Sequence, residues 1–440
     1  MSDIVIIGTG MAGLGAAHHF HSAGVATKTF DKNGFAGGHT YSHVYEDTGF
    51  IFDEGPHVSF SKDPRIQDLL AANVDGKFER MKVTVDNYYH GAWVKHPAQV
   101  NLHNLPAELK TRCILDFISA SQEKLVEKPK NYLEWLISAF GETFATHFPA
   151  VYGKKYHTCP AEKMSTVWMG PRLYRPTLEE VIRGAIFEET PDVHYIPNFR
   201  YPTEGGFVSY LKPFMEKTEI HLDHEVVEID PVARSVRFAN GAVETYDHLL
   251  SSIPLPDLIP MVKGAPDHVR AAAAKLACTQ CVTVNIGIAR NDFTPAAWTY
   301  IYDEDIVFTR LSFPHNMSPR TCPPGAGAIQ AECYYSEKYR PLTVAPDDLI
   351  QPVIDDLKRI GMMREDDEIL HADARFIPHA NIIFDLDREE ALPIVHGWLD
   401  EIGITCAGRY GEWGYQWTDE AFKSGERGAR DILEKIAIGV

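Results

Sequence analysis

The chain has 440 residues, of which 45% are hydrophobic and 23% charged, values ordinary for a soluble globular protein with a large core. These values exclude a disordered chain, a collagen-like repeat and a small scaffold held by disulfides. The formal net charge of −19 makes nucleic acid and an anionic membrane surface unfavourable partners.

The cysteine pattern predicts a reducing, cytoplasmic location. Seven cysteines, an odd number, are scattered along the chain, which is typical of free thiols. Cys278 and Cys281 form a single CxxC within an alternating strand pattern, and no second pair completes a zinc site, so we expect no metal. No apolar run reaches the length of about 18 residues that a spanning helix needs, so we expect no integral membrane segment. The sequence does not decide whether the protein forms a homo-oligomer.

The first thirty residues predict a βαβ unit that binds a dinucleotide. Residues 4–7 form a short apolar run, typical of a strand buried in a parallel sheet, and lead directly into the GxGxxG of residues 8–13. A helix is predicted over 14–22, and a second strand over 25–30 that closes at Asp31.

Each part of this motif has a physical task. Gly8 permits the tight turn, Gly10 lets the backbone approach a pyrophosphate, and Gly13 lets the helix pack closely on the strand. The helix N-terminus offers free N–H groups to the phosphates, and the carboxylate of Asp31 can accept hydrogen bonds from ribose hydroxyls.

Two further glycine-containing segments distinguish a flavin from a nicotinamide cofactor. Residues 37–40 read GGHT and residues 53–57 read DEGPH. This pattern resembles the flavoprotein superfamily of amine oxidases, protoporphyrinogen oxidases and UDP-galactopyranose mutases, and the resemblance implies FAD. It implies cofactor contacts for Gly8, Gly10, Met11, Ala12, Gly13, Asp31, Lys32, Gly37, Gly38, His39, Val227, Gly408, Arg409 and Trp413.

The rest of the chain divides by its periodicity. Residues from 107 to about 190 carry apolar groups three and four apart, whereas runs such as 282–286 alternate like strands of an antiparallel sheet. We expect an α/β fold in which a discontinuous Rossmann-like FAD-binding domain carries an inserted helical block and an antiparallel-sheet substrate domain. The predicted segments are 1–68, 203–258 and 392–440 for the FAD-binding domain, 99–187 for the helical block, and 69–98, 188–202 and 259–391 for the sheet domain.

Several segments resemble UDP-galactopyranose mutases in particular. They are the GPH of residues 55–57, WVKHPAQVNLHNLP at 93–106, the helical stretch 140–172, FRYPTEGG at 199–206 and GRYGEWGY at 408–415. The resemblance implies an FAD-dependent mutase that interconverts the pyranose and furanose forms of a UDP-sugar, of the UDP-galactose type, through a sugar adduct of the reduced flavin. It also implies an external reductant for the flavin.

The same resemblance assigns the substrate site. Its two pyrophosphate-binding arginines fall on Arg172 and Arg310, and guanidinium groups suit phosphate because their contacts are planar and bidentate. Tyr415 matches a tyrosine near the phosphates, and His57 lies in the segment beside the flavin ring. The resemblance thus implies catalytic roles for His57, Arg172, Arg310 and Tyr415, and substrate contacts for Gln99, Asn101, Arg172, Arg310 and Tyr415.

One departure leaves two other interpretations open. The mutases have a tyrosine in the segment that corresponds to residues 375–384, and here His379 and Asn381 stand in that neighbourhood without any tyrosine. The second interpretation is an FAD-dependent oxidoreductase, an oxidase or desaturase acting on an unidentified small molecule. The third is an FAD-stabilised binding protein without turnover.

Overall fold

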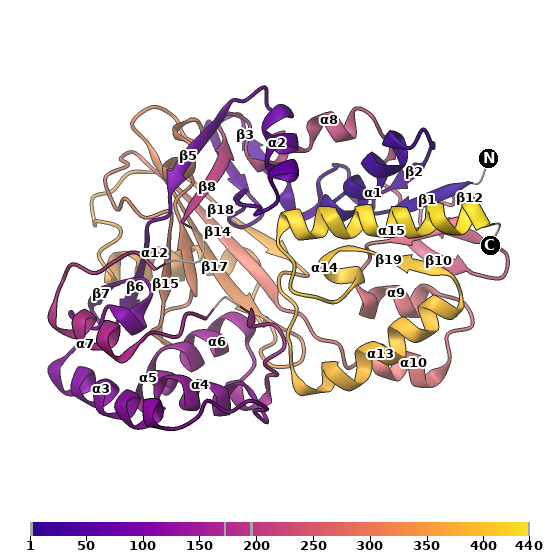
Figure 1. Cartoon of the computed structure of the whole chain (residues 1–440). Coiled ribbons are helices and arrows are strands. Elements are labelled where there is room, and N and C mark those ends of the chain that lie inside the picture. The colour runs from indigo at the N-terminus through magenta and orange to yellow at the C-terminus, as the bar shows by residue number, and fades with distance from the viewer. Residues whose placement is uncertain (1–2, 171–172, 194–196, 439–440) are drawn as a thin grey trace.

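The computed structural model describes residues 3–170, 173–193 and 197–438, and these form an α/β fold of two main sheets and a helical block (Figure 1). Arg172, one of the predicted substrate arginines, lies outside the described residues. The first strand and the last helix lie side by side (Figure 1). The unit that begins the chain is therefore also the unit that ends it.

The first main sheet is parallel, with five strands in the order β19-β13-β1-β2-β9. Its central strand β1 (Ile4–Ile7) is buried throughout, because alternate side chains pack against helices on opposite faces. Two of them contact α1 (Met11–Ser22) and α15 (Thr418–Ile438). Because helices cover both faces of the sheet, every side chain of this strand is buried, and all of them are apolar. The other strands are β2 (Lys28–Phe30), β9 (Glu219–His221), β13 (His248–Ser251) and β19 (Ile404–Cys406), and the second face carries α9 (Leu255–Met261), α10 (Asp267–Ala273) and α13 (Leu386–Glu401).

Two details of this unit differ from the sequence prediction. β2 begins at Lys28 rather than at residue 25, because Val25 N–H still bonds to the carbonyl of Phe20 at the end of α1, 2.9 Å away. Helix α10 and the start of α13 fall in the segment predicted for the sheet domain, yet they pack in the same core as β1. Periodicity identifies an apolar helix face but does not say which sheet that face covers.

The helical block packs around an aromatic core. Gly141, between the second and third of its helices, has a φ of +81°, and a Cβ there would lie 2.6 Å from the backbone of Asp116. A glycine is therefore required where two helices approach closely. The block comprises α3 (Ala107–Gln122), α4 (Tyr132–Phe140), α5 (Glu142–His147), α6 (Pro149–His157) and α7 (Leu178–Ile186).

The second main sheet has seven strands in the order β18-β14-β17-β16-β15-β6-β7. All its pairs are antiparallel, as predicted, except β15 with β6, which run parallel. Helix α12 (Ile350–Arg359) shares a hydrophobic core with this sheet. The strands are β6 (Val85–Tyr89), β7 (Ala92–Lys95), β14 (Gln280–Ile288), β15 (Trp298–Ile301), β16 (Arg310–Ser312), β17 (Gly327–Tyr335) and β18 (Ile369–Ile377).

Three small sheets and several short helices complete the fold. The Asn240-Gly241 turn lies between two strands of a three-stranded antiparallel sheet, and Gly241 has the positive φ of +88° that such a turn requires. The remaining elements are β3 (Ser42–Tyr45), β4 (Phe50–Asp53), β5 (Phe78–Lys82), β8 (Asn198–Pro202), β10 (Val226–Asp230), β11 (Ser235–Phe238), β12 (Val243–Thr245), α2 (Pro64–Ala72), α8 (Lys212–Met215), α11 (Pro314–Met317) and α14 (Gly408–Gly411).

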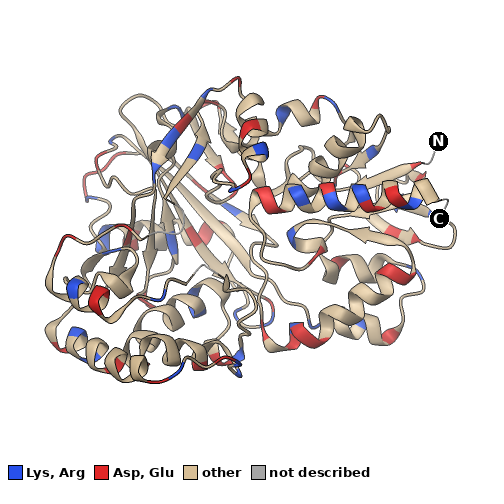
Figure 2. Ribbon diagram, in the orientation of Figure 1, with Lys and Arg blue, Asp and Glu red and all other residues tan. Residues whose placement is uncertain are grey.

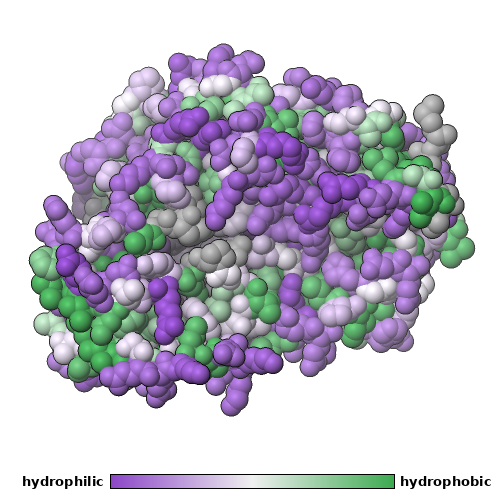
Figure 3. Space-filling model, in the orientation of Figure 1, coloured by the Kyte–Doolittle hydropathy of each residue, from purple (hydrophilic) through white to green (hydrophobic). Residues whose placement is uncertain are grey.

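The surface differs between the two ends of the molecule. Acidic and basic residues are interspersed along α15 (Figure 2), whereas apolar side chains gather over α3 and α7 (Figure 3). Among the described residues, no helix combines the length and apolar character needed to cross a bilayer. The exposed apolar side chains on and next to α3 and α7 are Leu115, Leu178, Ile182, Ile186 and Phe187.

Candidate functional site

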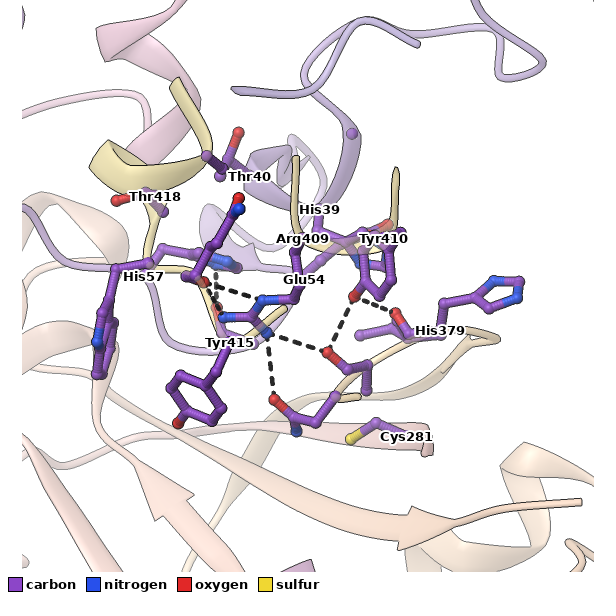
Figure 4. Close-up of a pocket in the computed structure, with 18 of the residues that line it drawn as sticks. His39, Thr40, Glu54, His57, Cys281, His379, Arg409, Tyr410, Tyr415 and Thr418 are labelled. Carbon is purple, nitrogen blue, oxygen red and sulfur yellow. Dashed lines mark hydrogen bonds and ion pairs between the residues drawn. The ribbon is translucent and has the colours of Figure 1, made fainter. Parts of the chain in front are cut away.

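A cavity of about 820 Å³ extends from the glycine-rich turn after β1 to the aromatic core of the helical block. This volume is within the range of small-molecule and cofactor sites, roughly 300–1,000 Å³. Residues of the parallel sheet line one end and residues of the helical block and the seven-stranded sheet line the other. Figure 4 shows the stretch between these ends, around His57, Arg409 and Tyr415.

The turn between β1 and α1 has the geometry that phosphate binding requires. Gly8 has a φ of +101°, and a Cβ at Gly13 would lie 1.8 Å from the carbonyl oxygen of Gly8. A Cβ at Gly38 would lie 3.0 Å from the Cα of Gly10, so the two glycine segments approach closely. Because the first N–H groups of α1 have no intrahelical partner, this bare backbone can hold a pyrophosphate.

Asp31 closes the turn from the end of β2. One carboxylate oxygen accepts hydrogen bonds from the backbone N–H of Thr9 at 2.8 Å and from its hydroxyl at 2.6 Å, and the other accepts from Asn33 N–H at 3.0 Å. A carboxylate has about four acceptor positions, so one stays available to a ribose hydroxyl in the cavity that Asp31 lines.

Most of the predicted cofactor residues border the cavity, and three do not. Val227 is 38% exposed and does not line the cavity, whereas Val226 is buried and lines it; the pairing of β10 with β11 is irregular between Val226 and Glu228, which leaves Val227 without a partner opposite it. Trp413 is fully buried in the core of the parallel sheet, and Gly13 packs behind the turn. The residues that do line the cavity are Gly8, Gly10, Met11, Ala12, Asp31, Lys32, Gly37, Gly38, His39, Gly408 and Arg409.

His57 lies at the middle of the cavity in a fixed tautomer. Its Nδ1 is 2.9 Å from the carbonyl oxygen of Gly55, so Nδ1 carries the proton and Nε2 is left as an acceptor. Burial lowers the pKa of His57 to about 4, and it lowers the pKa of His39, another lining residue, to about 4 as well. Both imidazoles are therefore neutral near pH 7.

Arg409 joins the C-terminal motif to the loop where the mutases have their tyrosine. Its guanidinium donates to the carbonyl of Gln416 at 3.0 and 2.5 Å, and to the carbonyl of Ala380 and the amide oxygen of Asn381 at 3.2 Å each (Figure 4). Asn381 also accepts from the hydroxyl of Tyr156 at 3.2 Å. Arg409 thus helps to hold this loop, together with the hydroxyl of Tyr410, which donates to the carbonyls of His379 and Ala380.

Arg310 lines the far end of the cavity and forms an ion pair with Glu332. The two residues face each other on β16 and β17; Nη2 donates to Oε1 at 2.8 Å and Nε donates to Oε2. Although burial alone would lower the pKa of Arg310, the Glu332 carboxylate raises it well above its usual value. Glu332 also accepts from Tyr334 at 2.8 Å. Arg310 is therefore a permanent cation whose charge is already balanced.

The other predicted substrate residues separate into two groups. Gln99 and Tyr415 line the main cavity, and Gln99 donates to the carbonyl of Tyr174 at 2.9 Å. Asn101 does not line it: its amide donates to the carbonyl of Pro97 at 2.8 Å, and the residue borders a second cavity of about 610 Å³. The amide of Asn101 is therefore used to hold its own 3-10 turn.

The sequence prediction missed an aromatic wall at the helical end. Aromatic residues recur there at every fourth position, and His157 follows them with a buried Nδ1 that has no hydrogen-bond partner. Residues four apart lie on one face of a helix, as Tyr152 and Tyr156 do in α6, but the earlier members belong to α4, α5 and the junction before α6, so the spacing alone was only part of the signal. The wall consists of Phe140, Phe144, Phe148, Tyr152 and Tyr156, joined by Tyr132, Trp168, Tyr300 and Tyr302.

The side chains around this site do not form a cluster of metal ligands. Within residues 3–170, 173–193 and 197–438, no group of three or more His, Cys, Asp or Glu side chains is placed to hold an ion. Cys278 and Cys281 are free thiols, and burial raises the pKa of Cys278 to about 12.

Comparisons with known proteins identify the flavin family. The family described as flavin containing amine oxidoreductase matches residues 11–433. The solved structure of a reduced UDP-galactopyranose mutase superposes with a TM-score of 0.92 at 27% identity, covering 99% of this chain and 96% of that one. A putative protoporphyrinogen oxidase from Exiguobacterium superposes with a TM-score of 0.76 at 17% identity, covering 98% and 99%.

The curated relatives match only part of the chain. A 4,4'-diapophytoene desaturase from Staphylococcus aureus is 22% identical over 305 residues, which are 60% of this chain and 59% of the desaturase. The chain thus spans less than two thirds of the length of the curated relatives it matches. The chain belongs to the family of flavin-containing amine oxidoreductases, and its cofactor is FAD.

Proposed function

We propose that this protein is an FAD-dependent mutase that interconverts the pyranose and furanose forms of a UDP-sugar of the UDP-galactose type. The observation that carries the proposal is the likeness to the reduced UDP-galactopyranose mutase, which extends over 99% of this chain at 27% identity. In the proposed reaction FAD, when bound in its reduced form, supplies the nucleophile for the anomeric carbon of the sugar. The proposal therefore requires an external reductant.

The cavity supports a division of labour between its two ends. The glycine-rich turn and Asp31 suit the adenosine diphosphate part of FAD, and His57 and Arg409 would then lie beside the flavin ring. Beyond the ring, Arg310 uses Nε and Nη2 on Glu332, which leaves Nη1 for an oxygen of the substrate diphosphate. Tyr415 lines the same region and suits a second phosphate contact.

The aromatic wall suits the remaining parts of a nucleotide sugar. Flat apolar side chains such as Phe144, Phe148 and Tyr152 exclude water and can stack on a nucleobase. Gln99 supplies a hydrogen-bonding group there. In this proposal the protein holds the departing diphosphate while the sugar is transferred, and the wall keeps water from the reacting carbon.

A second candidate, an FAD-dependent oxidase or desaturase, is favoured by two observations. Residues 375–384, the segment in which the mutases have a tyrosine, contain none here, and His379 and Asn381 stand in that neighbourhood. The charge of Arg310 is balanced by Glu332, so this arginine is not a bare cation waiting for a phosphate. An aromatic wall also suits an apolar substrate.

The two candidates differ in their need for reduced flavin. UDP-galactofuranose and UDP-galactopyranose are incubated separately with the purified protein, with and without dithionite, and the products are separated by chromatography. A mutase interconverts them only when the flavin is reduced. If dithionite bleaches the flavin and neither sugar changes, the mutase proposal fails for this sugar, and peroxide release in air from a panel of small molecules tests the oxidase.

A further inference from the structure

We propose that Glu54 is a fixed carboxylate that lowers the reduction potential of the bound FAD. The proposal rests on the FAD cofactor and not on the mutase reaction. Glu54 belongs to no predicted site and lines the cavity between the two glycine segments and His57.

The position of Glu54 is set by the hairpin that precedes it. The residue follows β4 directly, and its backbone N–H donates to the carbonyl of Tyr41 at 3.1 Å. One carboxylate oxygen lies 3.1 Å from Nε2 of His43 on the neighbouring strand β3, and the other lies 3.8 Å from Nδ1 of His39. The side chain is only 17% exposed. Glu54 is thus held from one side by the hairpin, with its carboxylate between His43 and His39.

The course of the cavity brings the flavin ring toward this carboxylate. Asp31 marks the adenosine end and the N-terminus of α1 marks the pyrophosphate. From there the cavity continues past His39 and Glu54 to His57 and Arg310. An elongated dinucleotide that begins at Asp31 has its ring in this second stretch, where Glu54 lies 3.8 Å from Nδ1 of His39 (Figure 4).

Glu54 carries a negative charge at neutral pH. Burial alone would raise its pKa, but the hydrogen bond to His43 and the nearby His39 hold the pKa of the Glu54 carboxyl below its usual value. The imidazoles of His39 and His57 are neutral at that pH, because burial lowers the pKa of each. The other charged or titratable groups around this stretch are Lys32, Asp257, Arg375, His379, Arg409 and His43.

Charge then decides the direction of the effect. Reduction by two electrons and one proton adds a negative charge to the flavin, and a fixed carboxylate beside it disfavours that charge, more strongly in a site that excludes water. Arg409 has the opposite effect. Removal of the carboxylate therefore makes the flavin easier to reduce, whatever reaction the flavin serves.

The test is the midpoint potential of the bound flavin, measured spectroscopically against a reference dye, in wild type and in Glu54→Gln. Glutamine keeps the size of the side chain and can still bond to His43. At a fixed potential we expect the ratio of reduced to oxidised flavin to rise about tenfold, which is a positive shift of about 30 mV for a two-electron couple. If Glu54→Gln does not retain FAD, Glu54→Met carries the same expectation.

Two control variants separate charge from packing. Glu46→Gln removes the same charge from an exposed position on the β3–β4 turn, and we expect its flavin ratio to stay within twofold of wild type. Glu54→Asp keeps the charge and should also stay within about threefold. Equal shifts in Glu54→Gln and Glu54→Asp, or none in Glu54→Gln, overturn the proposal. Because the readout is a potential, loss of mutase activity in any variant leaves the test of Glu54 unaffected.

Discussion

The two ends of the cavity bind by different means. At the parallel sheet the cavity is lined mainly by backbone. Gly8, Gly10 and Gly38 have no side chains there, and Asp31 accepts a hydrogen bond from the backbone N–H of Thr9. At the helical end the ligand meets side chains, an aromatic wall and the ion pair of Arg310 with Glu332. The backbone end is fixed by one short segment of sequence, whereas the side-chain end depends on how distant segments pack.

The largest effect should come from breaking the ion pair at the side-chain end. Arg310→Ala leaves the Glu332 carboxylate, 3% exposed, without its counter-ion. We expect the free energy of unfolding to fall by about 3–5 kcal/mol, measured by urea denaturation at pH 7. The double variant Arg310→Met/Glu332→Gln should be more stable than Arg310→Ala alone.

The same variant sharpens the substrate proposal. If enough Arg310→Ala folds for titration, its affinity for UDP should fall by about 2–4 kcal/mol, as for the loss of a charge-assisted phosphate contact. A loss of less than twofold would remove Arg310 from the substrate site and leave it a structural residue.

The next effect should appear at the backbone end. A methyl group at Gly13 has no room, because its Cβ would lie 1.8 Å from the carbonyl oxygen of Gly8. Gly13→Ala should lower the free energy of unfolding by about 3 kcal/mol and reduce FAD retention. FAD retention is measured as the absorbance of the flavin at about 450 nm divided by that of the protein at about 280 nm. Gly397→Ala is the matched control, since that glycine lies within α13 with open space around it. Equal losses in both variants would contradict this explanation.

Acid sensitivity should be a property of the aromatic wall, because His157 is buried in it. Burial lowers the pKa of His157 to about 3, below the usual value of about 6.5. The unfolded chain therefore takes up a proton as the pH falls below 6.5 while the folded protein does not, and stability is lost in that window. Between pH 7 and pH 5 this one group should cost about 2 kcal/mol.

His157→Phe removes the titration and keeps a ring in the wall. Between pH 7 and pH 5 the free energy of unfolding falls in both proteins, and the fall should be smaller in the variant. The difference between the two falls should be about 2 kcal/mol, the contribution of His157. An unchanged pH dependence would show that His157 is hydrated or paired in solution.

The contrast between the two ends also explains what the sequence could predict. Gly8, Gly10 and Asp31 were readable because their spacing within one βαβ unit carries the whole geometry. The position of Arg310 followed from a motif, but its partner Glu332 lies 22 residues away, and only the register of β16 on β17 places the two opposite each other.

Other residues depended on the packing of loops rather than on local pattern. Asn381 occurs in a segment without periodicity, and its contacts with Arg409 and Tyr156 come from three separate parts of the chain. Glu54 was visible in the DEGPH segment, but nothing local shows that the carboxylate points into the cavity rather than to solvent. A motif locates such residues without giving their partners.

The smallest predicted effect tests the strand register at the adenosine end. The phase of β10 decides whether Val226 or Val227 faces the cavity, and the structure places Val226 there, 4% exposed, with Val227 outside. Val226→Ala should cost about 1–2 kcal/mol of stability and weaken FAD binding, because it removes buried methyl groups from the core and the cavity wall. Val227→Ala, the matched control one residue away, should change stability by less than about 0.5 kcal/mol and leave FAD binding unaltered. The reverse result would show that Val227, and not Val226, faces the cavity at the irregular start of β10.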